Sequence, residues 1–61
     1  MGENARILIV DDDENIRKVL AMILEDEGYS VDQAETAKQA IEKTKKNVYN
    51  IALIDIRLPD M

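Results

Sequence analysis

The chain alternates between short apolar runs and segments of helical spacing, and this alternation constrains the fold more than any other feature. Residues 7–10 and 51–54 are apolar throughout, typical of strands buried on both faces. Residues 29–34 alternate weakly and indicate a shorter strand. Two sets recur at helical spacing: Ile16, Val19, Leu20, Ile23 and Leu24, then Ala37, Ala40, Ile41 and Thr44. The predicted order is strand, helix, strand, helix, strand.

Strands that alternate with helices predict an α/β fold with a parallel sheet and right-handed crossovers. The simplest doubly wound arrangement places the first strand in the middle, in the order 2-1-3. The two helices then cover opposite faces of the sheet. Such a sheet has a switch point at the carboxyl ends of strands one and three, where ligands bind in folds of this kind.

The expected helix ends carry capping residues. Asp13 is placed to cap the first helix, and Gly28 follows its end as a C′ residue. The segment 36–39 reads Thr-Ala-Lys-Gln, which fits a capping box for the second helix. These residues therefore support the same boundaries as the apolar spacing.

Composition removes several classes of function. The 61 residues include 13 acidic and 8 basic side chains, a net charge of −5, with no His and no Cys. Thiol chemistry, His-based proton transfer and a Cys/His zinc site are therefore excluded. The acidic excess argues against nucleic acid as a ligand, and no apolar run is long enough to span a membrane. We expect a soluble, cytoplasmic protein without membrane contact.

Three carboxylates should meet at the switch point. Asp11 and Asp12 follow the first strand, and Asp55 follows the third. Like charges in one crevice repel, and Mg²⁺, which prefers oxygen ligands, would relieve that repulsion. The alternative is that the aspartates after the first strand only end it and cap a helix. That alternative explains Asp55 poorly, because a carboxylate closing an apolar run is costly to bury without a partner.

Three competing motifs fit the sequence less well. An EF-hand loop starting at Asp11 would place Ile16 at the Gly position and Met22 at the bidentate Glu position. A phosphate-binding loop needs Gly after the first strand, and none occurs between Gly2 and Gly28. The Asp-x-Asp motif of haloacid dehalogenase-type phosphatases would leave Asp55 without a role in a chain too short for that fold.

The segments 7–13, Ile-Leu-Ile-Val-Asp-Asp-Asp, and 52–61, Ala-Leu-Ile-Asp-Ile-Arg-Leu-Pro-Asp-Met, resemble the receiver domain of two-component response regulators. The resemblance covers nearly the whole chain and implies a flavodoxin-like fold. It implies that Asp55 is the phospho-acceptor and that Asp11, Asp12 and Asp55 bind Mg²⁺. It also implies that the backbone carbonyl of Arg57 completes the metal site and that the Arg57 side chain influences the lifetime of the phosphoryl group.

The resemblance further implies a partner, a sensor histidine kinase whose phosphohistidine donates the phosphoryl group. In this family the first helix is the main kinase-docking surface. Its counterpart here begins near Glu14 and includes Arg17, Lys18 and Ala21. By composition alone, these positions are better read as a solvated face.

A complete receiver is about twice this length, near the usual domain size. We therefore interpret residues 1–61 as the N-terminal half of a receiver. The Ser/Thr and Lys of the complete phosphorylation site would follow Met61, so we expect impaired phosphotransfer and leave enzymatic activity open. The third strand would present an apolar edge, which favours homo-oligomers. The alternative function is a non-signalling, self-associating α/β fragment.

Overall fold

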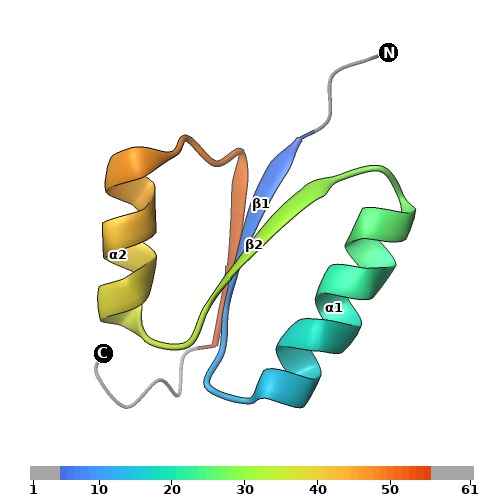
Figure 1. Ribbon diagram of the computed structural model, residues 1–61, viewed down its shortest axis with the longest axis horizontal. Coiled ribbons are helices and arrows are strands. Elements are labelled where there is room, and N and C mark those ends of the chain that lie inside the picture. Colours follow the sequence, from blue (N-terminus) through green and yellow to red (C-terminus); the bar gives the residue numbers. More distant parts are fainter. Residues whose placement is uncertain (1–4, 56–61) are drawn as a thin grey trace.

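The computed structural model describes residues 5–55 as three parallel strands and two helices (Figure 1). The strands are β1 (Arg6–Val10), β2 (Ser30–Ala34) and β3 (Ile51–Ile54), and the helices are α1 (Glu14–Asp26) and α2 (Ala37–Lys46). The sheet order is β2-β1-β3. The predicted element order, strand order and doubly wound topology are all confirmed.

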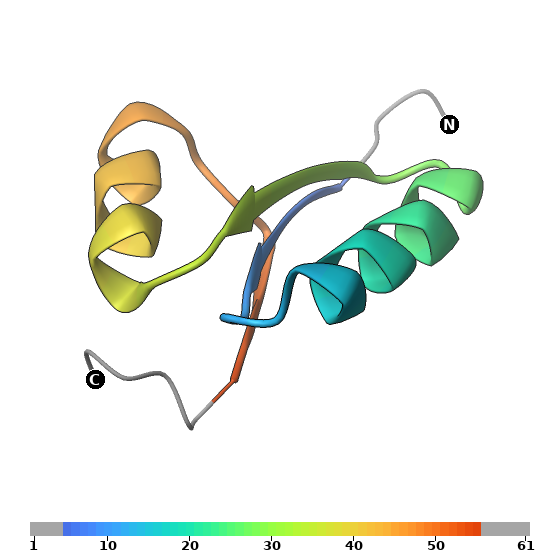
Figure 2. The same ribbon diagram turned by 60° about the horizontal axis from the view of Figure 1, so that its bottom comes forward.

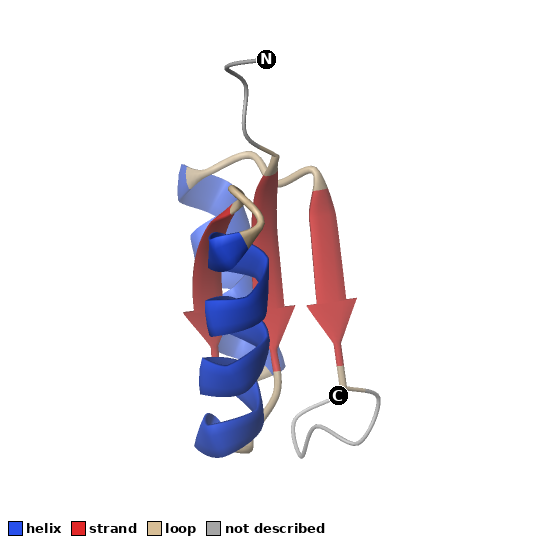
Figure 3. Ribbon diagram, turned by 90° about the vertical axis from the view of Figure 1, so that its right-hand side faces the viewer, coloured by secondary structure: helices blue, strands red, loops and turns tan. Residues whose placement is uncertain are grey.

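The central strand β1 supplies the core of both faces. Its side chains alternate, so Ile7 and Ile9 face α1 while Leu8 and Val10 face α2. All four are at most 3% exposed. Ala21 of α1 and Ala40 of α2 are the closely packed helix residues on the two sides. One helix therefore lies on each face of the sheet (Figures 2 and 3).

Both helices begin and end near the predicted residues. Gly28 has a φ of +99°, and its N–H donates to Glu25 O at 3.0 Å while Tyr29 N–H donates to Leu24 O at 3.1 Å. This pair of bonds is a Schellman motif, in which glycine supplies the left-handed conformation.

The predicted capping box of α2 involves Thr36 and Gln39, and the structure shows how both side chains accept main-chain N–H groups. Thr36 Oγ1 accepts from Gln39 N–H at 3.1 Å, as predicted. The Gln39 Oε1 accepts the N–H of Glu35 at 2.8 Å, one residue before the Thr36 N–H that a capping box predicts as its donor.

The apolar stripe of α1 is wider than the surface that the sheet offers it. Leu20 and Leu24 pack against β1, as predicted. Ile16, Val19 and Ile23 remain 39–55% exposed, which departs from the expectation of one buried face. The departure arises because α1 contacts β1 and β2 but not β3, so the sheet meets only part of the stripe. Ile41 of α2 is likewise exposed.

The strand β3 pairs with β1 in parallel and is covered by neither helix within the described residues. Figure 3 shows β3 standing clear of both helices at one edge of the sheet. Ile51 is 49% exposed and Leu53 is 41% exposed. Separately, no helix within residues 5–55 has the length and apolar character needed to cross a membrane.

Candidate functional site

Main-chain hydrogen bonds position the two ends of the candidate site. The N–H of Asp11 donates to Ala34 O at 3.1 Å, which extends the pairing of β1 and β2 by one residue. The N–H of Asp55 donates to Val10 O at 2.8 Å, which extends the pairing of β3 with β1. The sheet ladder therefore holds both residues at neighbouring strand ends.

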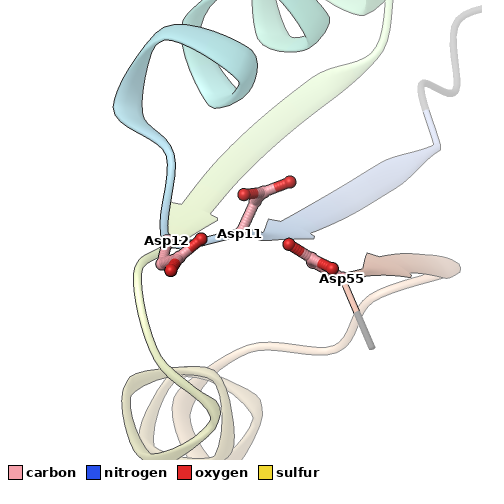
Figure 4. A group of neighbouring side chains, drawn as sticks. All are labelled: Asp11, Asp12 and Asp55. Atoms are coloured by element: carbon pink, nitrogen blue, oxygen red, sulfur yellow. The ribbon is translucent and has the colours of Figure 1, made fainter. Parts of the chain in front are cut away.

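The structure brings the three candidate carboxylates together at the carboxyl edge of the sheet. One oxygen from each of Asp11, Asp12 and Asp55 can be chosen so that all three lie within 4.8 Å of one another. Asp11 and Asp55 are half-buried and Asp12 is exposed. Figure 4 shows that two of the side chains come from the loop after β1 and the third from the end of β3. Arg57, the fourth predicted member, lies outside the described residues.

Asp13 belongs to the helix start and not to this group. Its Oδ1 accepts the N–H of Asn15 at 2.9 Å and of Ile16 at 3.3 Å, so it caps α1 as predicted. Its own N–H donates to Asp11 Oδ1 at 2.9 Å. The helix cap and this Asx turn both stabilise the conformation of the acidic loop.

The donor set fits a small hard cation. All three ligand atoms are carboxylate oxygens, the type that Mg²⁺ prefers. The three oxygens lie within 4.8 Å of one another, so they could hold one such ion after moving closer together or through a bridging water.

A hollow of about 210 Å³ opens beside two of the carboxylates. It is lined by Asp11 and Asp55 together with apolar residues of β1, α1 and β3, namely Ile9, Val10, Leu20, Leu53 and Ile54. The carboxylates therefore face both solvent and an apolar wall. Such a wall lowers the local dielectric and strengthens charge interactions at the site.

Arg17 has a role that the sequence did not suggest. It was expected on a solvated or docking face, but it is half-buried and its Nη1 donates to Asp11 O at 2.6 Å. Ala21, assigned to the same face, is 5% exposed and packs in the core. A cation near the start of a helix is unfavourable beside the positive end of the helix dipole. The position of Arg17 was therefore the sequence signal that could have indicated a tertiary contact for its side chain.

These features place the chain in the class of doubly wound α/β domains that carry a cluster of carboxylates at the switch point of the sheet. Within that class, residues 7–61 match the pattern of the response regulator receiver domain. The chain belongs to the response regulator receiver family.

Curated relatives and solved structures agree with this assignment. The transcriptional regulatory protein ResD of Bacillus subtilis is 43% identical over 54 residues, 88% of this chain and 22% of that protein. SrrA of Staphylococcus aureus is 42% identical over 55 residues, 90% of this chain and 23% of that protein. The chain thus spans less than a quarter of the length of these relatives.

Two solved structures superpose on 97% of the chain with a TM-score of 0.93. The chemotaxis response regulator CheY4 of Vibrio cholerae is 32% identical, and the chain covers 49% of it. A CheY-like receiver domain protein of Methanospirillum hungatei is 49% identical, and the chain covers 47% of it.

Proposed function

We propose that this chain is the phospho-acceptor part of a two-component receiver, with Asp55 as the acceptor. Asp11, Asp12 and Asp55 would hold Mg²⁺ together with the backbone carbonyl of Arg57. The observation that carries the proposal is the convergence of three carboxylates within 4.8 Å at the carboxyl edge of the sheet. Family membership supports the same assignment.

The proposed reaction is a phosphoryl transfer from a histidine kinase. A carboxylate oxygen of Asp55 forms a P–O bond to the phosphorus while the P–N bond of the phosphohistidine breaks. A Mg²⁺ ion held by these carboxylates would supply positive charge that neutralises the phosphoryl oxygens. The protein then contributes mainly by positioning, and the main-chain bond from Asp55 to Val10 O supports that role.

The same proposal extends to the part of the domain that the chain represents, its location and its relation to nucleic acid. Residues 1–61 correspond to the N-terminal half of a receiver, in keeping with coverage of 47–49% of the two solved structures. On the ground of family alone, we propose a cytoplasmic location. The net charge of −5 supports the proposal that this part of the protein does not bind nucleic acid directly.

The proposal is tested by incubating the chain with acetyl phosphate and Mg²⁺ and measuring its intact mass. We expect slow addition of one phosphoryl group, mapped to Asp55 by borohydride trapping. The Asp55→Asn variant should gain none. Asp26→Asn, which removes an exposed carboxylate at the far end of α1, is the matched control and should be labelled like the parent.

Equal labelling of parent and Asp55→Asn would contradict the acceptor assignment. A separate Mg²⁺ titration, followed by NMR shifts of the backbone amides, tests the metal site. We expect Asp12→Asn and Asp55→Asn to bind Mg²⁺ more weakly than the parent does. Unchanged affinity in both variants would reject the site.

The exposed β3 edge favours a second candidate, a self-associating α/β fragment. Neither helix contacts β3, and its apolar side chains Ile51, Leu53 and Ile54 are 41–51% exposed. An uncovered apolar edge strand offers unpaired main-chain groups to a second copy. This candidate concerns assembly and is compatible with phospho-acceptor chemistry.

A further inference from the structure

The Arg17 side chain connects α1 to the loop that carries the acidic pair. Its Nη1 donates to the main-chain carbonyl of Asp11 at 2.6 Å, and its Nε donates to Gln33 Oε1 on β2 at 3.3 Å. The N–H of Arg17 donates to Asp13 O at 3.1 Å. One residue therefore bridges the helix, the acidic loop and the neighbouring strand.

Helix stability does not explain a cation at this position. Arg17 is the fourth residue of α1, where the helix dipole favours negative charge, and Glu14 already meets that preference. Its two side-chain bonds, to a carbonyl and an amide oxygen, are directional contacts with neutral acceptors. These two bonds therefore fix the geometry of the loop and are not ion pairs.

The bond to Asp11 O orients the peptide group between Asp11 and Asp12. That peptide is planar, so the direction of its carbonyl sets the direction of the next N–H and Cα. On the other side of Asp11, its N–H is held by Ala34 O. The Asp11 main chain is thus fixed at both ends, and the path to Asp12 is fixed with it.

We propose that Arg17 is a positioning residue that orients Asp11 and Asp12 for a divalent cation. The proposal rests on the proposed function, since it presumes the cation site. In this proposal Arg17 acts through the main chain of the acidic loop, by its bond to Asp11 O, and not as a ligand of the cation. Gln33 is the second anchor, which keeps the guanidinium plane directed at Asp11 O.

The variants Arg17→Met and Arg17→Lys test this proposal, with Lys18→Met as the matched control. Lys18 is the next residue on α1, and its Nζ forms an exposed ion pair with Glu14 at 3.2 Å. Both Met variants remove one positive charge from the first half of α1. Loss of positive charge by itself strengthens cation binding, whereas loss of positioning weakens it. The two explanations therefore predict opposite signs.

Two readouts are compared in the full 61-residue chain, Mg²⁺ affinity and amide hydrogen exchange without metal. We expect Arg17→Met and Arg17→Lys to weaken Mg²⁺ binding about tenfold, as loss of a supporting hydrogen bond does in metal sites. We expect the Asp13 amide, which donates to Asp11 Oδ1, to exchange about fivefold faster in both variants. Lys18→Met should leave exchange unchanged and should not weaken affinity.

The proposal is overturned if Arg17→Met binds Mg²⁺ as tightly as Lys18→Met does, or if Asp13 exchange is the same in the two. Gln33→Met, which leaves the charge and α1 intact, should shift both readouts less and in the same direction. It replaces any Arg17 variant that does not fold. If the parent chain binds no Mg²⁺, the proposed metal site fails on that result, and the exchange data alone decide whether Arg17 holds the loop.

Discussion

Asp13 joins the acidic loop to the first helix, and its role is local. Its Oδ1 accepts two main-chain N–H groups at the start of α1, which otherwise have no partner in the helix. Replacing Asp13 with Ala should therefore lower the free energy of unfolding by about 1 kcal/mol. Urea denaturation followed by circular dichroism measures this change. Asp13→Asn, which keeps a capping oxygen without the charge, should remain close to the parent; an equal loss in both would contradict a capping role.

Tyr49 links three segments at the amino end of the sheet. Its hydroxyl donates to Asp32 Oδ2 at 2.6 Å, and the Arg6 guanidinium lies 5.8 Å from its ring centroid. Desolvation by burial, followed by the bond to Asp32 and the charge of Asp32, raises the pKa of Tyr49 above its ordinary value. The protonated hydroxyl is therefore the form that the folded state prefers.

Tyr49→Phe should lower the free energy of unfolding by about 1 kcal/mol at neutral pH, because Asp32 loses a hydrogen-bond donor. Since the folded pKa exceeds the unfolded one, this contribution is complete below about pH 10 and is lost as the pH rises through the folded pKa. Urea melts of parent and variant across this range should converge at high pH. A constant difference would contradict the assignment.

Each helix is defined by its ends as much as by its apolar spacing. The end of α1 requires a left-handed residue at Gly28, and apart from Gly28 and its two chain neighbours no atom of the described residues lies within 4 Å of the position that a Cβ would occupy there. Gly28→Ala should therefore lower the free energy of unfolding by about 1 kcal/mol for conformational reasons alone. Thermal denaturation measures it. Gly28→Asn, which tolerates positive φ better, should cost less; the reverse order would contradict the argument.

At the scale of the whole molecule, neither helix within residues 5–55 covers the β3 edge of the sheet. Because β3 carries apolar side chains on both faces and meets neither helix, we expect the 61-residue chain to self-associate at micromolar concentration. Sedimentation velocity measures this directly. Leu53→Lys should shift the chain toward monomer, whereas Val48→Lys, an exposed change before β3, should not. A folded monomer in the parent would contradict the prediction.

The sequence by itself determined the element order, the strand order 2-1-3 and the convergence of Asp11, Asp12 and Asp55. These follow from local spacing and from the rule that parallel strands end at one edge, so no side-chain detail was needed. The part played by Arg17 depended on tertiary structure, because its acceptors are a carbonyl in another segment and Gln33 on β2. The exposure of Ile16 and Val19 also depended on tertiary structure. Apolar spacing shows which residues share a helix face, but it does not show how much of that face a sheet will cover.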